Sequence, residues 1–340
     1  MELLADYALF LAKALTVVFA AGALLVLAAG LARRGSGEPG LTVERLNDHY
    51  AQLAQVLRRA AGDRDAWRRV AKVAKSERRS RRRGRAPRRA RTYVIDFRGD
   101  LRATAVAGLR EEVSTIIAVA ANDDDVLVRL ENAGGTVHEH GLAASQLGRL
   151  RAAGLRVTVA VDKVAASGGY LMAANADRIV AAPFALIGSI GVLAQLPNFH
   201  RWLKSRGVDF EMITSGRYKR TLTVFGENTD EGREKLREEI EDVHRLFKDE
   251  VARQREKLDI DAVATGEAWY ATRALELRLV DEIATSDELL QRAAEERDLL
   301  LLKYRWKRRL PERLAERADA LWAHAADFVA TLAQRARLLR

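Results

Sequence analysis

The sequence predicts an α/β protein with mostly parallel sheets and flanking helices, preceded by one transmembrane helix. From residue 92 onward, strand-like segments alternate with helical stretches of about 10–15 residues, which is typical of βαβ units. Near the amino terminus, 19 residues without a charge, Ala14–Ala32, would form about 28 Å of helix, enough to span a bilayer. Two glycine pairs, at 134–135 and 168–169, follow two of the predicted strands. In parallel sheets, active sites form beyond such strand ends.

Composition narrows the function. The 340 residues include no cysteine, which excludes disulfides, thiolate metal sites and cysteine nucleophiles. The net charge is +10, but Arg64–Arg91 holds 14 Lys and Arg against 2 acids, so the rest of the chain is slightly acidic. The basic character therefore belongs to one segment, and specific nucleic-acid binding by the folded body is not expected.

The apolar amino-terminal run is predicted to be a retained anchor. A cleaved signal peptide has basic residues before its apolar run, whereas here Glu2 and Asp6 precede it and Arg33 and Arg34 follow it. That order is a stop-transfer pattern, and the absence of a polar face argues against a buried soluble helix. Residues 1–40 are therefore predicted to be a membrane anchor and the GSGEPG exit linker.

Residues 41–91 are predicted to form an amphipathic helix and a basic linker. Apolar side chains recur every three or four residues, at Val43, Leu46, Tyr50, Leu53 and Leu57. The arginine-rich continuation is either a solvated linker or a segment that binds anionic lipid headgroups beside the anchor.

Residues 92–300 are predicted to form the compact domain. Its expected strands are 92–97, 126–132, 156–161 and 178–183, and its expected helices are 106–120, 140–154, 167–176 and 230–257. Residues 301–340 form a further basic amphipathic helix. We expect this helix to pack on the domain, with membrane binding or oligomer contacts as alternatives.

Ser167 is the candidate nucleophile from the residues alone. It lies in VDKVAASGGY at a predicted strand-to-helix turn, where small neighbours expose it and free backbone N–H groups can bind an oxyanion. The alternative is a serine that merely caps the helix.

Several side chains could act as the base. His138 and His140 follow the other glycine pair, so Ser–His chemistry is one possibility. The H-x-H pattern also suggests a metal site, but alternate residues of a helix do not share a face and no third ligand is evident. A lysine must instead be neutral near pH 7, far below its ordinary pKa of about 10.4, which burial can achieve. Lys163 adjoins Asp162, which favours its charged form, and Lys219 has apolar residues on one side. Spacing alone does not decide between these lysines.

Seven longer sequence segments are more specific than these single residues. The segments VIDFRGD, RLENAGG, HGLAASQL, VDKVAASGGYLMAANADRIVAAP, IGSIGVLAQLPNF, YKRTLTVFGENTDEGREK and ATGEAWY occur in order over more than half the chain. In them the chain resembles the SohB and signal peptide peptidase A family of membrane-bound serine peptidases. The resemblance implies a ClpP/crotonase-like fold and a Ser-Lys dyad, with Ser167 as nucleophile and Lys219 as general base. It also implies that Ser189 orients the lysine, and that the backbone N–H groups of Gly134 and Gly168 bind the oxyanion.

The same resemblance implies the wider function. We expect a membrane-bound serine endopeptidase that forms an acyl-enzyme and cleaves signal-peptide remnants or other unstructured, membrane-derived peptides. It is expected to be single-pass in the bacterial inner membrane, to contact the lipid bilayer, and to form a homo-oligomeric ring or dome without cofactor or metal. The positive-inside rule places the domain in the cytoplasm and relatives place it on the outer face, so its side stays open.

One departure and two alternatives accompany this reading. Ala133 stands where the family commonly has proline, so the oxyanion loop loses a residue that fixes φ. If that loop is impaired, the chain would be a non-catalytic membrane scaffold or peptide-binding protein. An acyl-CoA enzyme on the same fold would share the oxyanion loops but would use a carboxylate in place of the dyad.

Overall fold

The computed structural model describes residues 40–62, 76, 79 and 87–305. Residues Leu41–Tyr304 form one compact unit. The predicted membrane helix with most of its exit linker, most of the basic linker, and residues 306–340 of the predicted carboxy-terminal helix lie outside the described residues. The prediction that this helix begins at residue 301 is wrong, because residues 301–305 are the end of a strand, β10 (Asp298–Arg305), which pairs with residues 91–95. Among the helices that are described, none combines the length and apolar character needed to cross a membrane.

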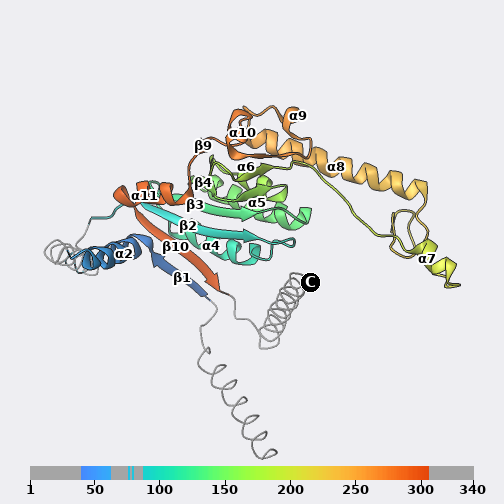
Figure 1. Cartoon of the computed structure of the whole chain (residues 1–340), viewed down its shortest axis with the longest axis horizontal. Coiled ribbons are helices and arrows are strands. Elements are labelled where there is room, and N and C mark those ends of the chain that lie inside the picture. Colours follow the sequence, from blue (N-terminus) through green and yellow to red (C-terminus); the bar gives the residue numbers. More distant parts are fainter. Residues whose placement is uncertain (1–39, 63–75, 77–78, 80–86, 306–340) are drawn as a thin grey trace, which may run out of the picture. The chain divides into compact units, whose positions relative to one another are not determined.

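The compact unit is built on a mixed but mainly parallel sheet (Figure 1). Its main path runs β1-β10-β2-β3-β4-β6-β9, and β5, β7 and β8 continue from β3 to the side. From β10 to β9 the strands pair in parallel, as does β5 with β3 and β7, whereas β7 and β8 are antiparallel. The strands are β1 Gly40–Arg45, β2 Arg91–Gly99, β3 Asp125–Asn132, β4 Arg156–Val161, β5 Val164–Ala166, β6 Arg178–Ala181, β7 Leu186–Gly188, β8 Ala268–Tyr270, β9 Glu282–Ile283 and β10 Asp298–Arg305.

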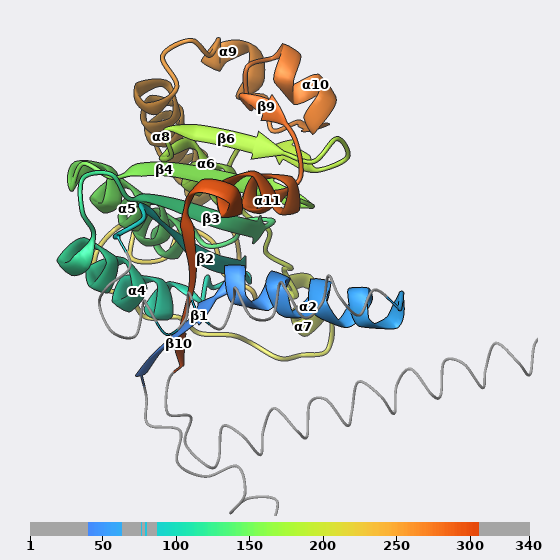
Figure 2. The same ribbon diagram turned by 90° about the vertical axis from the view of Figure 1, so that its left-hand side faces the viewer.

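Helices cover both faces of this sheet, which explains why its strands are apolar on both sides. Successive side chains of a strand alternate between faces. Tyr93, Ile95 and Phe97 accordingly join the main core, under α4 (Val106–Val119), α5 (Val137–Ala152) and α6 (Gly168–Ala174). Val94 joins a second core, under α2 (Leu46–Ala60) and α11 (Ser286–Glu296). Figure 2 shows α11 in front of the strands.

A long excursion separates β7 from α8 (Asp230–Gln254). We call residues 191–229 the arm; it contains α7 (His200–Ser205) and leads into the 25-residue α8. In Figure 1, α7 and the start of α8 lie away from the strands, whereas the end of α8 returns to them. The chain then adds α9 (Ile260–Val263) and α10 (Ala271–Glu276) beside β8 and β9.

The predicted strands and helices of the domain are present, with shifts of a few residues at most ends. The amino-terminal side differs more. Val43 lies in β1, and the helix begins only at Leu46, because residues 40–45 pair with β10. That pairing joins segments about 260 residues apart, so the local apolar spacing does not reveal it. As a result, β1 and α2 belong to the same sheet and cores as residues 92–300.

Candidate active site

Two loops meet where β3 and β5 end. Residues 133–136 join β3 to α5, and Ser167 alone joins β5 to α6. A Cβ atom on Gly134 would lie 2.7 Å from the Cβ of Ser167 and 2.9 Å from the backbone nitrogen of Gly168. We call residues 133–136 the glycine loop and Ser167 with Gly168 the serine turn. The structure brings the two into direct contact.

The serine turn is strained and tightly held. Ser167 has φ 51° and ψ −123°, a conformation that side chains rarely adopt and that recurs where a nucleophile is presented between a strand and a helix. Its N–H donates to the Gly188 carbonyl at 2.8 Å, and its own carbonyl accepts from Leu171 at 3.0 Å. The residue occupies the cap position of α6, but its side chain makes no capping hydrogen bond. Within the part of the chain that the structure describes, the hydroxyl is thus not engaged in capping the helix.

Two neighbours support this turn. Gly168 leaves no room for a side chain, because a Cβ there would lie 2.5 Å from Cγ of His140. The Gly168 N–H has no acceptor among the described residues. Tyr170 is fully buried and donates its hydroxyl to the Leu279 carbonyl at 3.0 Å, which fixes α6. Burial raises the pKa of the Tyr170 phenol, so the hydroxyl remains a donor.

The glycine loop contacts Asn132, the residue that precedes it, and the backbone of Leu101. Gly134 has φ +91°, and its N–H donates to Oδ1 of Asn132 at 2.9 Å, which forms an Asx turn. Of the two glycines predicted to bind an oxyanion, Gly168 thus has an unused N–H, and that of Gly134 has an internal acceptor. A Cβ on Gly135 would lie 2.1 Å from the Leu101 carbonyl oxygen, so no side chain fits at this position of the loop.

The two histidines lie in different environments. His138 is exposed, and its Nε2 lies 3.9 Å from Glu139. His140 is fully buried; its Nδ1 lies 3.0 Å from the Thr136 carbonyl and its Nε2 lies 3.2 Å from Oδ1 of Asn132. Both ring nitrogens of His140 are thus occupied by groups other than the Ser167 hydroxyl. The rings do not face one common site.

Ser189 lies one residue beyond the backbone partner of the serine turn. In the β5–β7 pairing, Ala166 is opposite Gly188, so Ser167 and Ser189 each follow a paired residue. Ser189 also has φ 51°, and its N–H donates to the Glu267 carbonyl at 2.6 Å. The structure therefore places Ser189 beside the strand end that carries Ser167.

Lys163 has an ion-pair partner. Its Nζ lies 3.0 Å from Oε1 of Glu131, and the side chain is mostly exposed. The neighbouring carboxylate, Asp162, accepts instead from the N–H and hydroxyl of Ser286 at 2.8 and 2.6 Å. These contacts give Lys163 a place in a surface ion pair.

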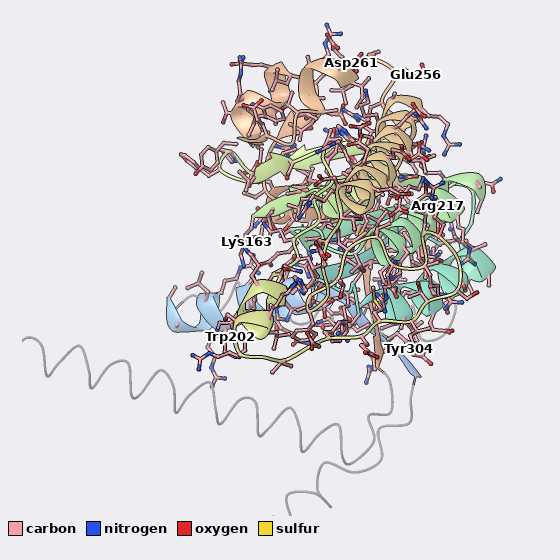
Figure 3. The ribbon with its side chains drawn as sticks, turned by 90° about the vertical axis from the view of Figure 1, so that its right-hand side faces the viewer. Lys163, Trp202, Arg217, Glu256, Asp261 and Tyr304 are labelled. Atoms are coloured by element: carbon pink, nitrogen blue, oxygen red, sulfur yellow. The ribbon has the colours of Figure 1, made fainter. Side chains whose placement is uncertain are left out.

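Lys219 lies on the arm and is exposed. Two residues earlier, Arg217 pairs with Glu231 at the start of α8, at 2.6 Å. The other end of α8 is anchored in the main core by Val251, and 20 residues of helix between these points span about 30 Å. Figure 3 labels Trp202 and Arg217 on the arm, and Lys163 before β5. In this structure, the Lys219 side chain is exposed and forms no hydrogen bond with Ser167 or Ser189.

Asn132 is a further residue of the site, which the sequence motifs did not single out. It is 1 % exposed, and its amide binds both the glycine loop and His140. An asparagine at the end of a strand, two residues before a glycine, is a recognisable Asx-turn signal. The involvement of His140 could not be read in the same way, because it depends on how α5 packs beneath the serine turn.

The chain matches two models of one known family. The model "Peptidase family S49 N-terminal" matches residues 2–147, and the model "Peptidase family S49" matches residues 149–300. The chain belongs to peptidase family S49. Together, the two matches include both the glycine loop and the serine turn.

Among relatives, this S49 chain is 53 % identical over 231 residues to "Probable protease SohB" of Haemophilus influenzae, covering 68 % of this chain and 65 % of that one. It is also 53 % identical over 221 residues to "Probable protease SohB" of Buchnera aphidicola subsp. Acyrthosiphon pisum, covering 65 % of this chain and 66 % of the relative. "Protease 4" of Haemophilus influenzae is 27 % identical, over 54 % of this chain and 31 % of its own length. The matches thus span slightly less than two thirds of the SohB relatives.

One solved structure, a "1510-N membrane-bound stomatin-specific protease", covers 61 % of this chain and 86 % of its own. Its sequence identity is 13 % and its TM-score is 0.41, values too low to bear on the fold.

Proposed function

We propose that this chain is a membrane-bound serine endopeptidase in which Ser167 is the nucleophile and Lys219 the general base. The observation that carries the proposal is the serine turn. A serine whose hydroxyl does not cap the helix is held at φ 51° against a glycine loop, beside a Gly168 N–H that has no acceptor among the described residues. Strain of this kind costs about 1–3 kcal/mol and persists where the surroundings enforce it. The proposed subclass of the α/β fold is ClpP/crotonase-like.

In the proposed reaction, Ser167 attacks a peptide carbonyl and Lys219 takes the hydroxyl proton. The N–H of Gly168 donates to the oxyanion. Gly134 supplies a second donor when its N–H exchanges Oδ1 of Asn132 for the substrate oxygen. The protonated Lys219 then gives this proton to the leaving amine as the peptide C–N bond breaks, so that the amine product departs and the acyl-enzyme remains. The neutral lysine next takes a proton from a water that hydrolyses the acyl-enzyme, which releases the acid and restores the Ser167 hydroxyl. Ser189 is proposed to orient the lysine by a hydrogen bond.

The dyad requires a change in the position of Lys219. A neutral lysine base needs apolar surroundings, and Lys219 is exposed in the described structure. The arm that carries it exposes many apolar side chains, among them Leu193, Trp202 and Ile213 at 75, 59 and 96 %. Packing of the arm would bury both these side chains and Lys219. This packing occurs either on the body of the same chain or on a second copy, which accords with a homo-oligomer in a ring or dome.

The proposed substrates are signal-peptide remnants or other unstructured, membrane-derived peptides. The small residues around Ser167 leave room for small or apolar side chains of such peptides. Attachment to the bilayer of a bacterial inner membrane by the single amino-terminal helix would hold the enzyme near them. The function requires no cofactor.

The test is covalent labelling of the full-length protein with a phosphonylating probe, followed by mass spectrometry of the modified residue. We expect modification of Ser167, and none in Ser167→Ala. Modification of another residue, with Ser167 untouched, would overturn the assignment. A folded protein that neither reacts nor hydrolyses an unstructured peptide would instead support the non-catalytic scaffold.

A further inference from the structure

A buried polar pair, His140 and Asn132, lies directly beneath the glycine loop. His140 is fully buried and Asn132 is 1 % exposed. Burying polar groups is costly unless their hydrogen bonds are satisfied, so such a pair needs a structural reason. This pair contacts both the glycine loop and the serine turn.

The hydrogen bonds fix the orientation of the Asn132 amide. Its Oδ1 accepts from the Gly134 N–H at 2.9 Å, and its Nδ2 faces Sδ of Met172 at 3.3 Å. The same Oδ1 lies 3.2 Å from Nε2 of His140. Amide and carbonyl oxygens can only accept, and a neutral imidazole has one N–H, so the ring can donate either to Asn132 or to the Thr136 carbonyl. The Thr136 carbonyl already accepts from the His140 backbone N–H at 3.1 Å, and we therefore assign the ring proton to Nε2, which donates to Asn132.

The His140 ring also reaches the other end of the loop. Its Nδ1 lies 3.0 Å from the carbonyl oxygen of Thr136, the last residue of the glycine loop. One ring thus touches the residue before the loop and the residue that ends it. It also packs on the serine turn, since a Cβ on Gly168 would lie 2.5 Å from its Cγ.

We propose that His140 is a positioning residue for the reaction at Ser167. It holds the Asn132 amide oxygen toward the loop, and that oxygen holds Gly134 against Ser167. The inference rests on the proposed function, because the position of these N–H groups matters when an oxyanion forms there. When the Gly134 N–H turns to the oxyanion, the His140 donor keeps the buried Asn132 oxygen satisfied, which avoids the cost of an unpaired acceptor.

Substitution of His140 tests this role. His140→Phe keeps an aromatic ring and removes both nitrogens, and we expect kcat for an unstructured peptide to fall about 10- to 100-fold, with KM changed less than about threefold. His140→Gln keeps an N–H donor for Asn132 and is expected to retain most of kcat. His138→Phe, at the exposed histidine two residues earlier, is the matched control and is expected to behave as wild type. The pH at which the rate rises is expected to be the same in all variants, because another group is the base.

A second measurement does not depend on catalysis. In the resting full-length protein, hydrogen exchange of residues 132–136 is expected to quicken about tenfold in His140→Phe, because the loop loses contacts at both ends. Adding Ala133→Pro is expected to slow it again and to recover part of kcat. Proline would fix φ at 133, the strand conformation of Asn132 suits a following proline, and the Ala133 N–H donates to no described residue.

The outcomes separate the two proposals. A folded His140→Phe with wild-type kcat and wild-type exchange overturns the positioning role, as does a shift of the pH limb, which would make His140 the base. If His140→Phe does not fold, His140→Gln decides, and a tenfold loss of kcat in that variant overturns the donor role. If exchange quickens in His140→Phe as expected, but Ser167 of the wild-type protein never reacts with the probe, then the positioning of the loop stands and the proposed function is refuted.

Discussion

The serine turn and the arm carry the two halves of one proposed dyad, and they are built in opposite ways. Around Ser167, both backbone groups are bonded, the glycines leave no space for side chains, and buried side chains enclose the turn. Around Lys219, the side chains are exposed. The arm contains a small cluster of three phenylalanines. The ring centroids of Phe199 and Phe210 lie 6.3 and 5.9 Å from that of Phe225.

The difference indicates how such a site is assembled. A strained nucleophile persists only inside a rigid surrounding, so the serine turn has to be completed when the sheet folds. A lysine that must lose its charge is costly to bury before it has a role. Placing it on an exposed arm postpones that cost until the arm packs. The comparison therefore predicts a nucleophile that is preorganised and a base that is delivered.

The largest expected effect concerns this delivery. Ser167→Ala and Lys219→Ala are each expected to lower kcat by about 10⁴-fold or more, because nucleophile and base act as a unit. If the arm delivers Lys219 to a second copy, mixing the two inactive variants restores activity, since some sites combine an intact Ser167 with an intact Lys219. The measurement is peptide hydrolysis after the variants are mixed and allowed to exchange subunits.

Three results are informative there. Recovery of activity places the base on a second copy, and no recovery despite proven exchange places it on the same chain. Full activity of either single variant would remove the dyad itself. The double variant Ser167→Ala with Lys219→Ala, mixed with itself, is the control for contaminating peptidases.

A matched pair of glycines compares the rigidity of the two regions. Gly134 and Gly216 have nearly the same φ, +91° and +96°, but a Cβ on Gly134 meets Ser167 at 2.7 Å, and one on Gly216 meets only Lys219, at 4.0 Å. Gly134→Ala is expected to cost about 3 kcal/mol or more of unfolding free energy, and Gly216→Ala about 1 kcal/mol, since only the first adds a clash to the strain. Urea unfolding of the two variants measures this, and equal losses would mean that the turn is no tighter than the arm.

The sequence predicted four parallel strands of the sheet, the main helices and the position of the two glycine pairs at strand ends, because these depend on local periodicity and on the rule that parallel strands end at one edge. It predicted no strand at β5, β7, β8, β9 or β10. It did not predict that residues 40–45 pair with β10, or that His140 lies beneath the turn, since both depend on contacts between distant segments. Ser167 and Ser189 emerge as neighbours because their strands pair. The local sequence did not predict the environment of Lys219. Its apolar sequence neighbours suggested a buried side chain, whereas the side chain is exposed on the arm.

Ion pairs provide the finest comparison. In the body, Arg255 binds both oxygens of Asp281 at 2.7 and 2.8 Å, and Ile179 N–H adds a third bond at 2.7 Å. Burial alone would raise the pKa of the Asp281 carboxyl, but the Arg255 and Ile179 hydrogen bonds and the nearby arginine charges outweigh it, so this pKa is lowered. On the arm, the Arg217–Glu231 pair is more than half exposed on both sides.

Because the folded-state pKa of Asp281 is depressed, its contribution is present above the ordinary aspartate pKa, about 3.9, and is lost as the pH falls through the lowered value. At pH 7, Asp281→Asn is expected to lower the free energy of unfolding by about 1–2 kcal/mol. This loss is smaller than for a fully buried pair, because the carboxylate is partly exposed. Glu231→Gln is expected to lower the free energy of unfolding by less than about 0.5 kcal/mol. Unfolding in urea at pH 7 and at pH 3 measures both, and the Asp281→Asn deficit is expected to shrink at the lower pH. A Glu231→Gln loss as large as that of Asp281→Asn would show that the start of α8 is held as firmly as the body, and that the arm is not free to deliver Lys219.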